Sequence, residues 1–318
     1  MTKNFALIGA AGYIAPRHLQ AIKDTGNVLI AALDRSDSVG ILDRFFPDSA
    51  FFTEFERFDR HVEKLRRQEE ANRVHFVSIA SPNYLHDAHI RFALRVGADA
   101  ICEKPLVLNP WNADALRELE KETGKRVYNV LQLRLHPSII ALKEKIAKEK
   151  SSKKYDIELT YVTSRGRWYE VSWKGDVHKS GGVATNIGIH FFDMLLWIFG
   201  KLQSQVVHIA DDQKMSGFFE LEKARVRWFL SIDRDDLPQE ALKAGQTTYR
   251  SLSVNSEKFE FSDGFANLHS DVYRGVLTGQ GFGIEDARPS IELAHEMRSA
   301  VPIGLKGEYH PLAKLGAK

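Results

Sequence analysis

The sequence predicts an α/β protein of two domains, the first built on a parallel sheet and the second on a large, mostly antiparallel open sheet. The chain has 318 residues, which is long for a single hydrophobic core. Up to residue 134, short apolar runs alternate with helical patterns, as in βαβ units. From residue 155, apolar residues recur with period two, as in half-buried antiparallel strands. We therefore expect domains over residues 1–134 and 135–318, the second an α+β domain.

Composition excludes several classes of function. The chain is 43% apolar and 27% charged, as in ordinary globular proteins, and its net charge of +2 gives no case for binding nucleic acid or an anionic membrane. No run of about 18 apolar residues suggests a membrane span. Cys102 is the only cysteine, so neither an intrachain disulfide nor a thiolate metal cluster is expected. We expect a cytoplasmic protein without a bound metal.

The first strand and helix carry a dinucleotide-binding pattern. Residues 5–8 are apolar, residues 9–15 form a glycine turn with the spacing Gly-x-x-Gly-x-x-Ala, and a helical stretch follows from Pro16. Small residues at Gly9 and Gly12 allow the backbone to approach a pyrophosphate at the helix N-terminus. The spacing is one residue longer than Gly-x-Gly-x-x-Gly, and such a turn can also be a simple tight connection.

The second apolar run, residues 28–33, ends in an acidic residue. Asp34 follows Gly12 at the distance, about 20 residues, at which an acidic side chain binds the adenine ribose and disfavours a 2′-phosphate. This favours NAD as the cofactor, although Asp34 can also be read as a helix N-cap. Arg35, directly after it, could still tolerate the 2′-phosphate of NADP.

Further strands are expected at residues 50–52, 76–80, 99–102 and 127–133. Two of them end in polar residues at the edge where open α/β sheets bind ligands. Residues 81–83 are Ser-Pro-Asn, and residues 103–105 are Glu-Lys-Pro. Pro105 forces the chain to leave the sheet, so Lys104 is held at a strand end. A surface Glu-Lys pair after a strand is the alternative.

The C-terminal half shows alternating segments at residues 155–162, 205–209, 217–221, 224–232 and 249–254. Between the first two lies a glycine-rich turn, Gly181-Gly182, followed by Asn186, His190 and an apolar helix. A lone histidine on an apolar helix is more often a core residue than a functional one.

These motifs together resemble the Gfo/Idh/MocA family of nicotinamide-dependent sugar and polyol oxidoreductases. The resemblance implies a Rossmann domain followed by an open-sheet domain, with a cis peptide before the Glu-Lys-Pro proline. It also implies that Lys104 and His190 lie beside the nicotinamide and the substrate. Asn186 stands where many members of the family have Asp, which puts an Asp–His dyad in doubt.

Oxidation of a secondary alcohol needs a hydride acceptor and a base. Histidine, with an ordinary pKa near 6.5, suits this at neutral pH, whereas lysine, near 10.4, needs a perturbed environment. We expect His190 to act as the base and Lys104 to polarise the substrate oxygen; the reverse or a shared role stays open.

The resemblance and the strand-end placement give the following site residues. Cofactor contacts are expected from Gly9, Gly12, Tyr13, Ile14, Asp34, Arg35, Ser81, Asn83, His86, Glu103, Lys104 and Gln132. Substrate contacts are expected from Lys104, Arg134, Arg165, Arg167, Trp168, Tyr169, Asn186 and His190. The basic and aromatic residues suit a carboxylate or diphosphate and a sugar or base. A solvated cluster at a strand end is the alternative.

Within the family, the patterns at residues 9–18, 131–137 and 186–190 are most similar to the enzymes that oxidise the 3-hydroxyl of UDP-linked N-acetylglucosaminuronate. That similarity implies a UDP-sugar substrate, a role in the O-antigen of lipopolysaccharide, NADH recycling by 2-oxoglutarate, and a homotetramer. Two alternatives are a dehydrogenase of a free sugar or inositol, and a non-catalytic NAD-binding sensor.

Overall fold

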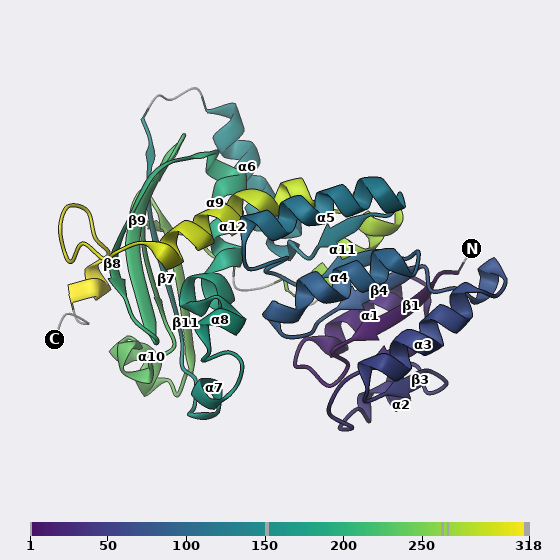
Figure 1. Ribbon diagram of the computed structural model, residues 1–318. Helices are drawn as coiled ribbons and strands as arrows, with labels where there is room; N and C mark the ends of the chain where they lie inside the picture. Colours follow the sequence, from purple (N-terminus) through teal and green to yellow (C-terminus); the bar gives the residue numbers. More distant parts are fainter. Residues whose placement is uncertain (1, 150–152, 262–263, 266, 315–318) are drawn as a thin grey trace. The chain divides into compact units, whose positions relative to one another are not determined.

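The computed structural model describes residues 2–149, 153–261, 264–265 and 267–314 (Figure 1). The chain forms two compact units. The first consists of Met1–Leu135 and Phe265–Arg288, and the second of His136–Gly264 and Pro289–Lys318. The expected boundary lies one residue from the first division of the structure. Residues 265–288, which the sequence patterns left in the second domain, belong to the first unit.

The first unit contains a parallel sheet of six strands in the order β3-β2-β1-β4-β5-β6. The strands are β1 Asn4–Ile8, β2 Val28–Leu33, β3 Ala50–Phe52, β4 Phe76–Ile79, β5 Asp99–Cys102 and β6 Val127–Asn129. The strand order reverses between β1 and β4, and open α/β sheets bind their ligands at such a reversal, beyond the carboxyl ends of the strands. This confirms the predicted Rossmann architecture.

Helices cover both faces of this sheet. The helices are α1 Ala15–Asp24, α2 Ile41–Phe45, α3 Phe55–Arg66, α4 His86–Arg95, α5 Pro110–Thr123 and α11 Leu268–Leu277. α1 packs against α2 and α11, and α4 packs against α5. α3 contacts α4 through Phe55 and Phe58, whose rings lie 5.3 and 5.4 Å from Phe92.

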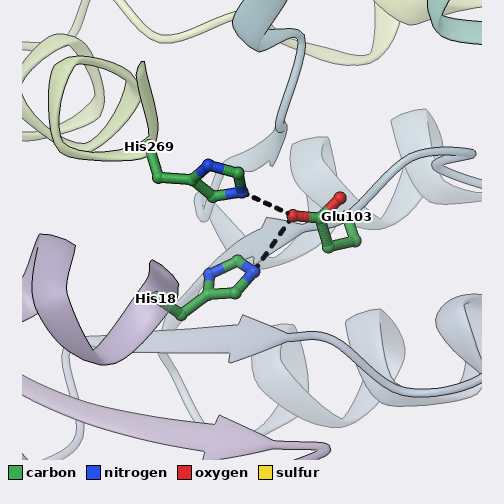
Figure 2. A group of neighbouring side chains, drawn as sticks. All are labelled: His18, Glu103 and His269. Carbon is green, nitrogen blue, oxygen red and sulfur yellow. Dashed lines mark hydrogen bonds and ion pairs between the residues drawn. The ribbon is translucent and has the colours of Figure 1, made fainter. Parts of the chain in front are cut away.

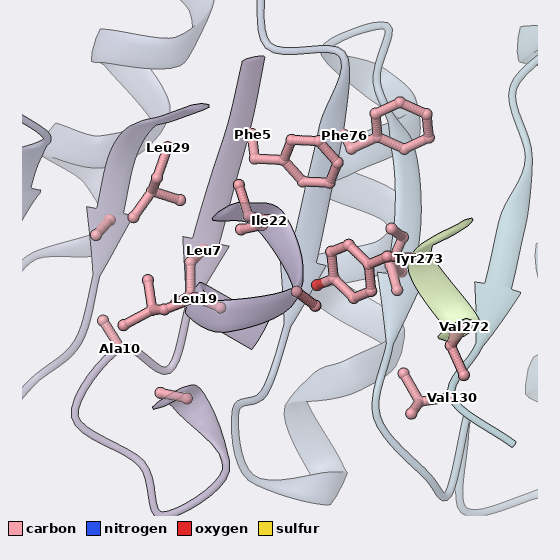
Figure 3. Close-up of a cluster of buried hydrophobic side chains, with 14 of the residues drawn as sticks. Phe5, Leu7, Ala10, Leu19, Ile22, Leu29, Phe76, Val130, Val272 and Tyr273 are labelled. Atoms are coloured by element: carbon pink, nitrogen blue, oxygen red, sulfur yellow. The ribbon is translucent and has the colours of Figure 1, made fainter. Parts of the chain in front are cut away.

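The core beneath α1 and α11 is shown in Figure 3. Phe5 of β1 stacks on Phe76 of β4 at 5.0 Å and on Tyr273 of α11 at 5.7 Å. Leu19 and Ile22 of α1 are fully buried in the same cluster. Burying a large apolar side chain stabilises a fold by roughly 1.5–3 kcal/mol, so α11 is an integral part of this unit.

Strand β6 is shorter than the predicted strand over residues 127–133. The backbone N–H of Asn129 donates to the carbonyl of Phe282, and its side-chain amide donates to the carbonyls of Cys102 and Glu103. The chain then forms a 3₁₀ turn over Gln132–Leu135. The hydrogen bonds of the Asn129 side chain therefore end strand β6 at this residue, whereas the apolar pattern predicted a strand up to residue 133.

The second unit contains a mixed, mostly antiparallel sheet in the order β12-β11-β7-β10-β9-β8, as expected. Its strands are β7 Tyr155–Thr163, β8 Leu202–Ala210, β9 Lys214–Leu221, β10 Ala224–Ser231, β11 Thr248–Val254 and β12 Glu257–Lys258. β7 and β10 run parallel, and the other described neighbours run antiparallel.

Helix α9 Ile189–Phe199 packs on this sheet and against α6 Pro137–Lys148. Phe192 of α9 lies 5.4 Å from Trp228 and 5.8 Å from Phe219. The stretch Val177–Phe199 has the length and composition of a membrane span, and 78% of its most apolar part is buried inside the protein.

The remaining helical elements are shorter or lie late in the chain. They are α7 Trp168–Val171, α8 Val177–Ser180, a π-helical turn over Ala184–Gly188, α10 Gln239–Lys243, α12 Ile284–Ser299, and 3₁₀ turns over Glu70–Asn72, Asn83–Leu85, Arg234–Asp236 and Pro311–Lys314. The π-helical turn directly precedes α9, at the position of Asn186. Such turns are frequent at functional sites.

Candidate functional site

The glycine turn after β1 lies against the end of β4. The N–H groups of Gly9 and Ala10 both donate to the carbonyl of Leu33, at 2.8 and 3.2 Å. Gly9 has φ +96°, and a Cβ there would lie 2.5 Å from the carbonyl oxygen of Ala80. Only glycine fits, because a side chain would require both a disfavoured conformation and a clash with backbone. The turn therefore brings bare backbone to the reversal point of the sheet.

Helix α1 begins directly after this turn. In the part of the chain that the structure describes, no side chain caps its N-terminus and no acidic residue lies in its first turn. The N–H groups of Ala15 and Arg17 donate to the carbonyls of Gly12 and Ile14, and Pro16 has no N–H, so it is the helix dipole that makes this end suitable for a phosphate. Tyr13, at the tip of the turn, is 99% exposed, and Ile14 is half-buried.

Asp34, at the end of β2, faces the glycine turn. Its two carboxylate oxygens accept the backbone N–H groups of Ala11 and Ser36, each at 2.9 Å. Each oxygen retains a further lone pair, so the carboxylate can also accept ribose hydroxyls. Asp34 is thus not a helix N-cap but fixes the turn to the strand end. Arg35 is exposed.

The residues after β4 are tied to the residues after β5. The ring of His86 lies between the carbonyl oxygens of Ser81, at 2.8 Å, and Pro105, at 2.7 Å. His86 and Asn83 are both buried. Burial lowers the pKa of His86. Both ring nitrogens of His86, which was expected to contact the cofactor, thus contact backbone carbonyls and connect the segments that follow β4 and β5.

Glu103 lies in a buried cluster with two histidines from distant segments (Figure 2). Its Oε1 lies 3.1 Å from Nε2 of His18 on α1 and 2.9 Å from Nε2 of His269 on α11. Burial alone would raise the pKa of Glu103, but the hydrogen bonds from the two histidines hold it well below its ordinary value. The carboxylate expected to contact the cofactor is therefore engaged within the protein.

Lys104 follows at the end of β5. Its backbone N–H donates to Oε2 of Glu103 at 3.3 Å, and its side chain is half-buried. The peptide bond between Lys104 and Pro105 is cis, as the resemblance implied. The lysine is thus fixed to a buried anion through its backbone.

Gln132 and Arg134 lie in the 3₁₀ turn after β6. Oε1 of Gln132 is buried and has no hydrogen-bond partner among the described residues. The guanidinium of Arg134 is buried, donates to Asp286 at 3.2 and 2.7 Å, and lies over the ring of Phe282. This geometry favours a structural role for Arg134 over the expected substrate contact.

These features of the first unit fit a dinucleotide. The backbone cradle at Gly9 and the uncapped start of α1 suit a pyrophosphate, and Asp34 suits a ribose. The buried Oε1 of Gln132 is an acceptor that a bound amide or hydroxyl can satisfy. Gly9, Gly12, Asp34 and Gln132 are therefore the residues of this chain that would hold NAD.

In the second unit, the structure joins two of the predicted substrate residues. The side-chain amide of Asn186, in the π-helical turn, donates to the hydroxyl of Tyr169 at 2.5 Å. Burial raises the pKa of Tyr169. His190, at the start of α9, packs against Phe191 at 4.1 Å and Tyr161 at 6.0 Å. Asn186 thus donates a hydrogen bond to Tyr169. An aspartate at this position would instead accept a hydrogen bond from the tyrosine hydroxyl.

The basic and aromatic cluster lies around α7. Arg165, Arg167 and Trp168 are exposed. Lys174, which sequence reasoning did not select, lies 5.3 Å from the ring of Trp168 and 4.8 Å from that of Trp173. Burial and, less strongly, the charge of Arg165 lower the pKa of Lys174. A cavity of about 200 Å³ is lined by Tyr169, Lys174, Gly181, Gly182, Met215 and Arg298, among others.

Sequence reasoning also missed the roles of His18 and His269. His18 follows the glycine turn in sequence, but nothing local signals that its ring meets Glu103. His269 lies 166 residues from Glu103. Such a contact becomes visible only when α11 is known to pack on the first sheet.

Comparison with known proteins identifies the family. Residues 3–130 match the model "Oxidoreductase family, NAD-binding Rossmann fold" and residues 143–236 match "Oxidoreductase family, C-terminal alpha/beta domain", both of Gfo/Idh/MocA. D-glucoside 3-dehydrogenase of Escherichia coli is 30% identical over 142 residues, which cover 44% of this chain and 40% of that protein. The chain spans about two fifths of the length of the first curated relatives that it matches.

Two solved structures are similar over nearly the whole chain. Both are of the WlbA (WbpB) dehydrogenase from Thermus thermophilus. The complex with NAD and α-ketoglutarate is 52% identical, with a TM-score of 0.92 and coverage of 97% of this chain and 99% of that chain. The complex with NAD and UDP-GlcNAcA is 51% identical, with a TM-score of 0.92 and coverage of 98% and 99%. The family, the fold and the NAD-binding domain predicted from the sequence are confirmed, and this chain belongs to the Gfo/Idh/MocA family of oxidoreductases.

Proposed function

We propose that this protein oxidises the 3-hydroxyl of UDP-linked N-acetylglucosaminuronate to the 3-keto sugar with NAD. The observation that carries the proposal is the 51–52% identity, over almost the full chain, to a dehydrogenase crystallised with NAD and UDP-GlcNAcA. The backbone cradle at Gly9 and the carboxylate of Asp34 support the same cofactor in this chain. The presence of both Lys104 and His190 argues against a non-catalytic NAD-binding sensor.

Lys104 and His190 are the proposed catalytic residues. NAD, when bound, supplies the hydride acceptor. His190 takes the proton of the 3-hydroxyl, since an imidazole is a suitable base near neutral pH. Lys104 donates a hydrogen bond to the same oxygen and stabilises the negative charge that develops there. The backbone hydrogen bond to Glu103 supports this role, because it fixes the residue that carries the ammonium group.

Substrate recognition is proposed for the cluster around α7. The exposed guanidinium groups of Arg165 and Arg167 suit the uronate carboxylate or the diphosphate, and the exposed ring of Trp168 suits a sugar or base face. Tyr169 and Asn186 hold each other by a hydrogen bond of 2.5 Å, which gives this region a fixed polar edge. We assign the first unit to the cofactor and the second to the substrate.

A 2-oxo acid is the proposed oxidant that restores NAD. One similar structure holds α-ketoglutarate together with NAD. The 2-oxo carbonyl accepts the hydride and one proton and becomes a 2-hydroxy acid, so the two half-reactions balance. The carboxylates of the 2-oxo acid suit the arginines that receive the uronate. We further propose a cytoplasmic homotetramer that serves O-antigen synthesis, by likeness to this branch of the family.

The test is a substrate panel with catalytic NAD. Purified protein is incubated with UDP-N-acetylglucosaminuronate or UDP-N-acetylglucosamine, with and without 2-oxoglutarate, while 2-hydroxyglutarate and NADH are measured. We expect 2-hydroxyglutarate to form with the uronate. We expect the neutral sugar to react roughly 10- to 100-fold more slowly in kcat/KM, because an arginine left unpaired costs about 1–3 kcal/mol.

Variants of the same assay test the arginines. Arg165→Gln and Arg167→Gln are expected to reduce the ratio of kcat/KM for the uronate to kcat/KM for the neutral UDP-sugar. Arg57→Gln, an exposed arginine on α3 paired with Glu54, is the matched control and keeps the preference. Equal rates for both sugars would overturn carboxylate recognition, and free NADH in stoichiometric yield without an effect of 2-oxoglutarate would overturn recycling.

One specific match favours a second candidate. The E. coli relative named D-glucoside 3-dehydrogenase suggests a sugar without a nucleotide. Glucosides and inositol in the same panel decide between the two, because a free-sugar dehydrogenase turns them over faster than the UDP-sugars.

A further inference from the structure

The cluster of His18, Glu103 and His269 joins three segments of the first unit at one oxygen atom. Both imidazole Nε2 atoms approach Oε1 of Glu103, at 3.1 and 2.9 Å (Figure 2). The three residues are 0%, 7% and 6% exposed. Water does not supply missing hydrogen bonds readily at such burial, so the protons of the cluster must be placed by the protein itself.

The following arrangement of protons satisfies these contacts. An ionised carboxylate only accepts, so both Nε2 atoms carry a proton and donate to Oε1. Nδ1 of a neutral His18 is then an acceptor, and the hydroxyl of Tyr273 donates to it at 2.7 Å. The hydroxyl of Ser78 donates in turn to the Tyr273 oxygen at 2.6 Å. A carboxylate that accepts a hydrogen bond from each ring, with His18 neutral, is therefore consistent with these contacts.

The same three residue types also form metal sites, and their ligand atoms lie within 4.8 Å of one another. Two ligands of a tetrahedral metal with bonds of 2.0–2.1 Å lie about 3.4 Å apart. The observed separations of 2.9 and 3.1 Å are those of ordinary hydrogen bonds. The contact from Tyr273 completes the hydrogen bonding of His18 without an ion. The geometry thus favours protons over a metal.

We propose that His18 and His269 are positioning residues for Lys104. They hold the carboxylate of Glu103 as an anion in one orientation, and its other oxygen, Oε2, accepts the backbone N–H of Lys104 at 3.3 Å. The place of the lysine at the end of β5 is thereby set by α1 and by α11. This inference rests on the catalytic role proposed for Lys104.

The first test is a pair of substitutions at His269. His269→Phe keeps a ring but removes the donor, and it should lower kcat by roughly 10- to 100-fold, since small misplacements of a catalytic group have effects of this size. The KM of the sugar and the Kd of NAD should change less than about threefold, because the cradle at Gly9 is untouched. His269→Gln retains a side-chain N–H donor and should recover much of the lost kcat.

The matched control is His75→Phe. His75 is half-buried in the same unit, and its Nδ1 accepts the backbone N–H of Asn4 at 3.0 Å, before the start of β4. This variant loses one histidine hydrogen bond without touching Glu103, and its kcat should match the wild type. If His269→Phe keeps the wild-type kcat, or if His75→Phe loses as much, the positioning role is overturned.

A second measurement does not depend on turnover. In protein with ¹⁵N-labelled histidine, long-range ¹H–¹⁵N spectra should show a proton on Nε2 of both His18 and His269. Elemental analysis of the purified protein should show no stoichiometric transition metal. Protonation at Nδ1 in both rings, or one metal ion per chain lost in Glu103→Gln, would overturn the proton assignment.

Lys104→Ala distinguishes failure of the inference from failure of the proposed function. If Lys104→Ala keeps near-normal turnover, the catalytic role of Lys104 is wrong, and the positioning role falls with it. If Lys104→Ala is inactive while His269→Phe is fully active, only the positioning role is overturned.

Discussion

Asp34 combines a structural and a recognition role in one carboxylate. It accepts N–H groups from Ala11 and Ser36, so it holds the glycine turn in the shape that Gly9 makes possible. The same negative charge at the end of β2 favours a ribose with free hydroxyls over one that carries a phosphate. Arg35 beside it is exposed, so the acidic residue dominates this edge.

We expect Asp34→Ala to weaken NAD binding and to relax discrimination against NADP. Loss of charge-assisted hydrogen bonds costs about 1.5–3 kcal/mol, which corresponds to roughly 10- to 100-fold in the Kd of NAD. Calorimetric titration with each cofactor measures both effects. Asp37→Ala, three residues further along at an exposed position, is the control and should bind both cofactors like the wild type. Wild-type protein that binds NADP as tightly as NAD would contradict the role of Asp34.

At the scale of elements, α11 connects the core of the first unit to its functional edge. Tyr273 stacks on Phe5, and its hydroxyl contacts both His18 and Ser78. Ser270, one turn earlier, donates to Asp24 of α1 at 2.7 Å. A single helix thus contributes to packing on the sheet, to the end of α1 and to the cluster at Glu103.

Two substitutions at Tyr273 separate these contributions. Tyr273→Phe should destabilise the first unit by about 1–3 kcal/mol, because it leaves buried groups on His18 and Ser78 without their partner. Tyr273→Ala should cost about 3–5 kcal/mol, since it also leaves a cavity against Phe5. Hydrogen exchange of the β1 and β4 amides reports on this unit specifically. Wild-type protection in Tyr273→Phe would contradict a contribution of the hydroxyl, and equal protection in the two variants would contradict a separate contribution of the ring.

Local patterns predicted much of this architecture, and long-range contacts account for what they missed. The glycine turn, Asp34 and the strand leading to Lys104 were visible because each depends on residues that are adjacent or regularly spaced. The membership of α11 in the first unit was not visible, because a helical period does not say which sheet the helix covers. The early end of β6 depends on the side-chain contacts of Asn129 with another strand.

For the site, residue types were predictable but their partners were not. Asn186 was noticed as a departure from the family pattern, yet its contact with Tyr169 appears only in the folded chain. Arg134 and Glu103 were expected to face ligands because they follow strands at the binding edge. Both are engaged inside the first unit, with Asp286 and with two histidines, since strand-end position alone does not fix side-chain direction.

At the scale of the whole molecule, buried neutral histidines occur in both units. Burial, with a small contribution from His86, lowers the pKa of His89 to about 4. Burial and the charge of Arg227 lower the pKa of His310 to about 3. His310 contacts the hydroxyl of Thr160 at 2.9 Å and stacks on Phe229. The unfolded chain, in which histidine has its ordinary pKa of about 6.5, binds more protons than the folded chain at mildly acidic pH.

The free energy of unfolding should therefore be greatest above about pH 6.5 and should fall as the pH drops toward the folded values. Each unit of pKa difference corresponds to about 1.4 kcal/mol per group. Urea midpoints at pH 7.5, 6.0 and 5.0 measure the slope. His310→Asn should flatten it for the second unit, whereas the exposed His178→Asn should not. An unchanged midpoint between pH 7.5 and 5.0 would contradict this linkage.

The first unit is discontinuous in sequence, which has a consequence for how the chain is made. Ribosomes deliver the N-terminus first, and most domains can fold as soon as they have emerged. Here the residues that complete the first core, Val272, Tyr273 and Val276, are translated after every strand of the second sheet. Until α11 has been synthesised, Phe5 and Phe76 in the core of the first unit remain incompletely buried. During synthesis from the N-terminus, the second sheet can therefore form before the core of the first unit is complete, although its strands follow those of the first sheet in the sequence.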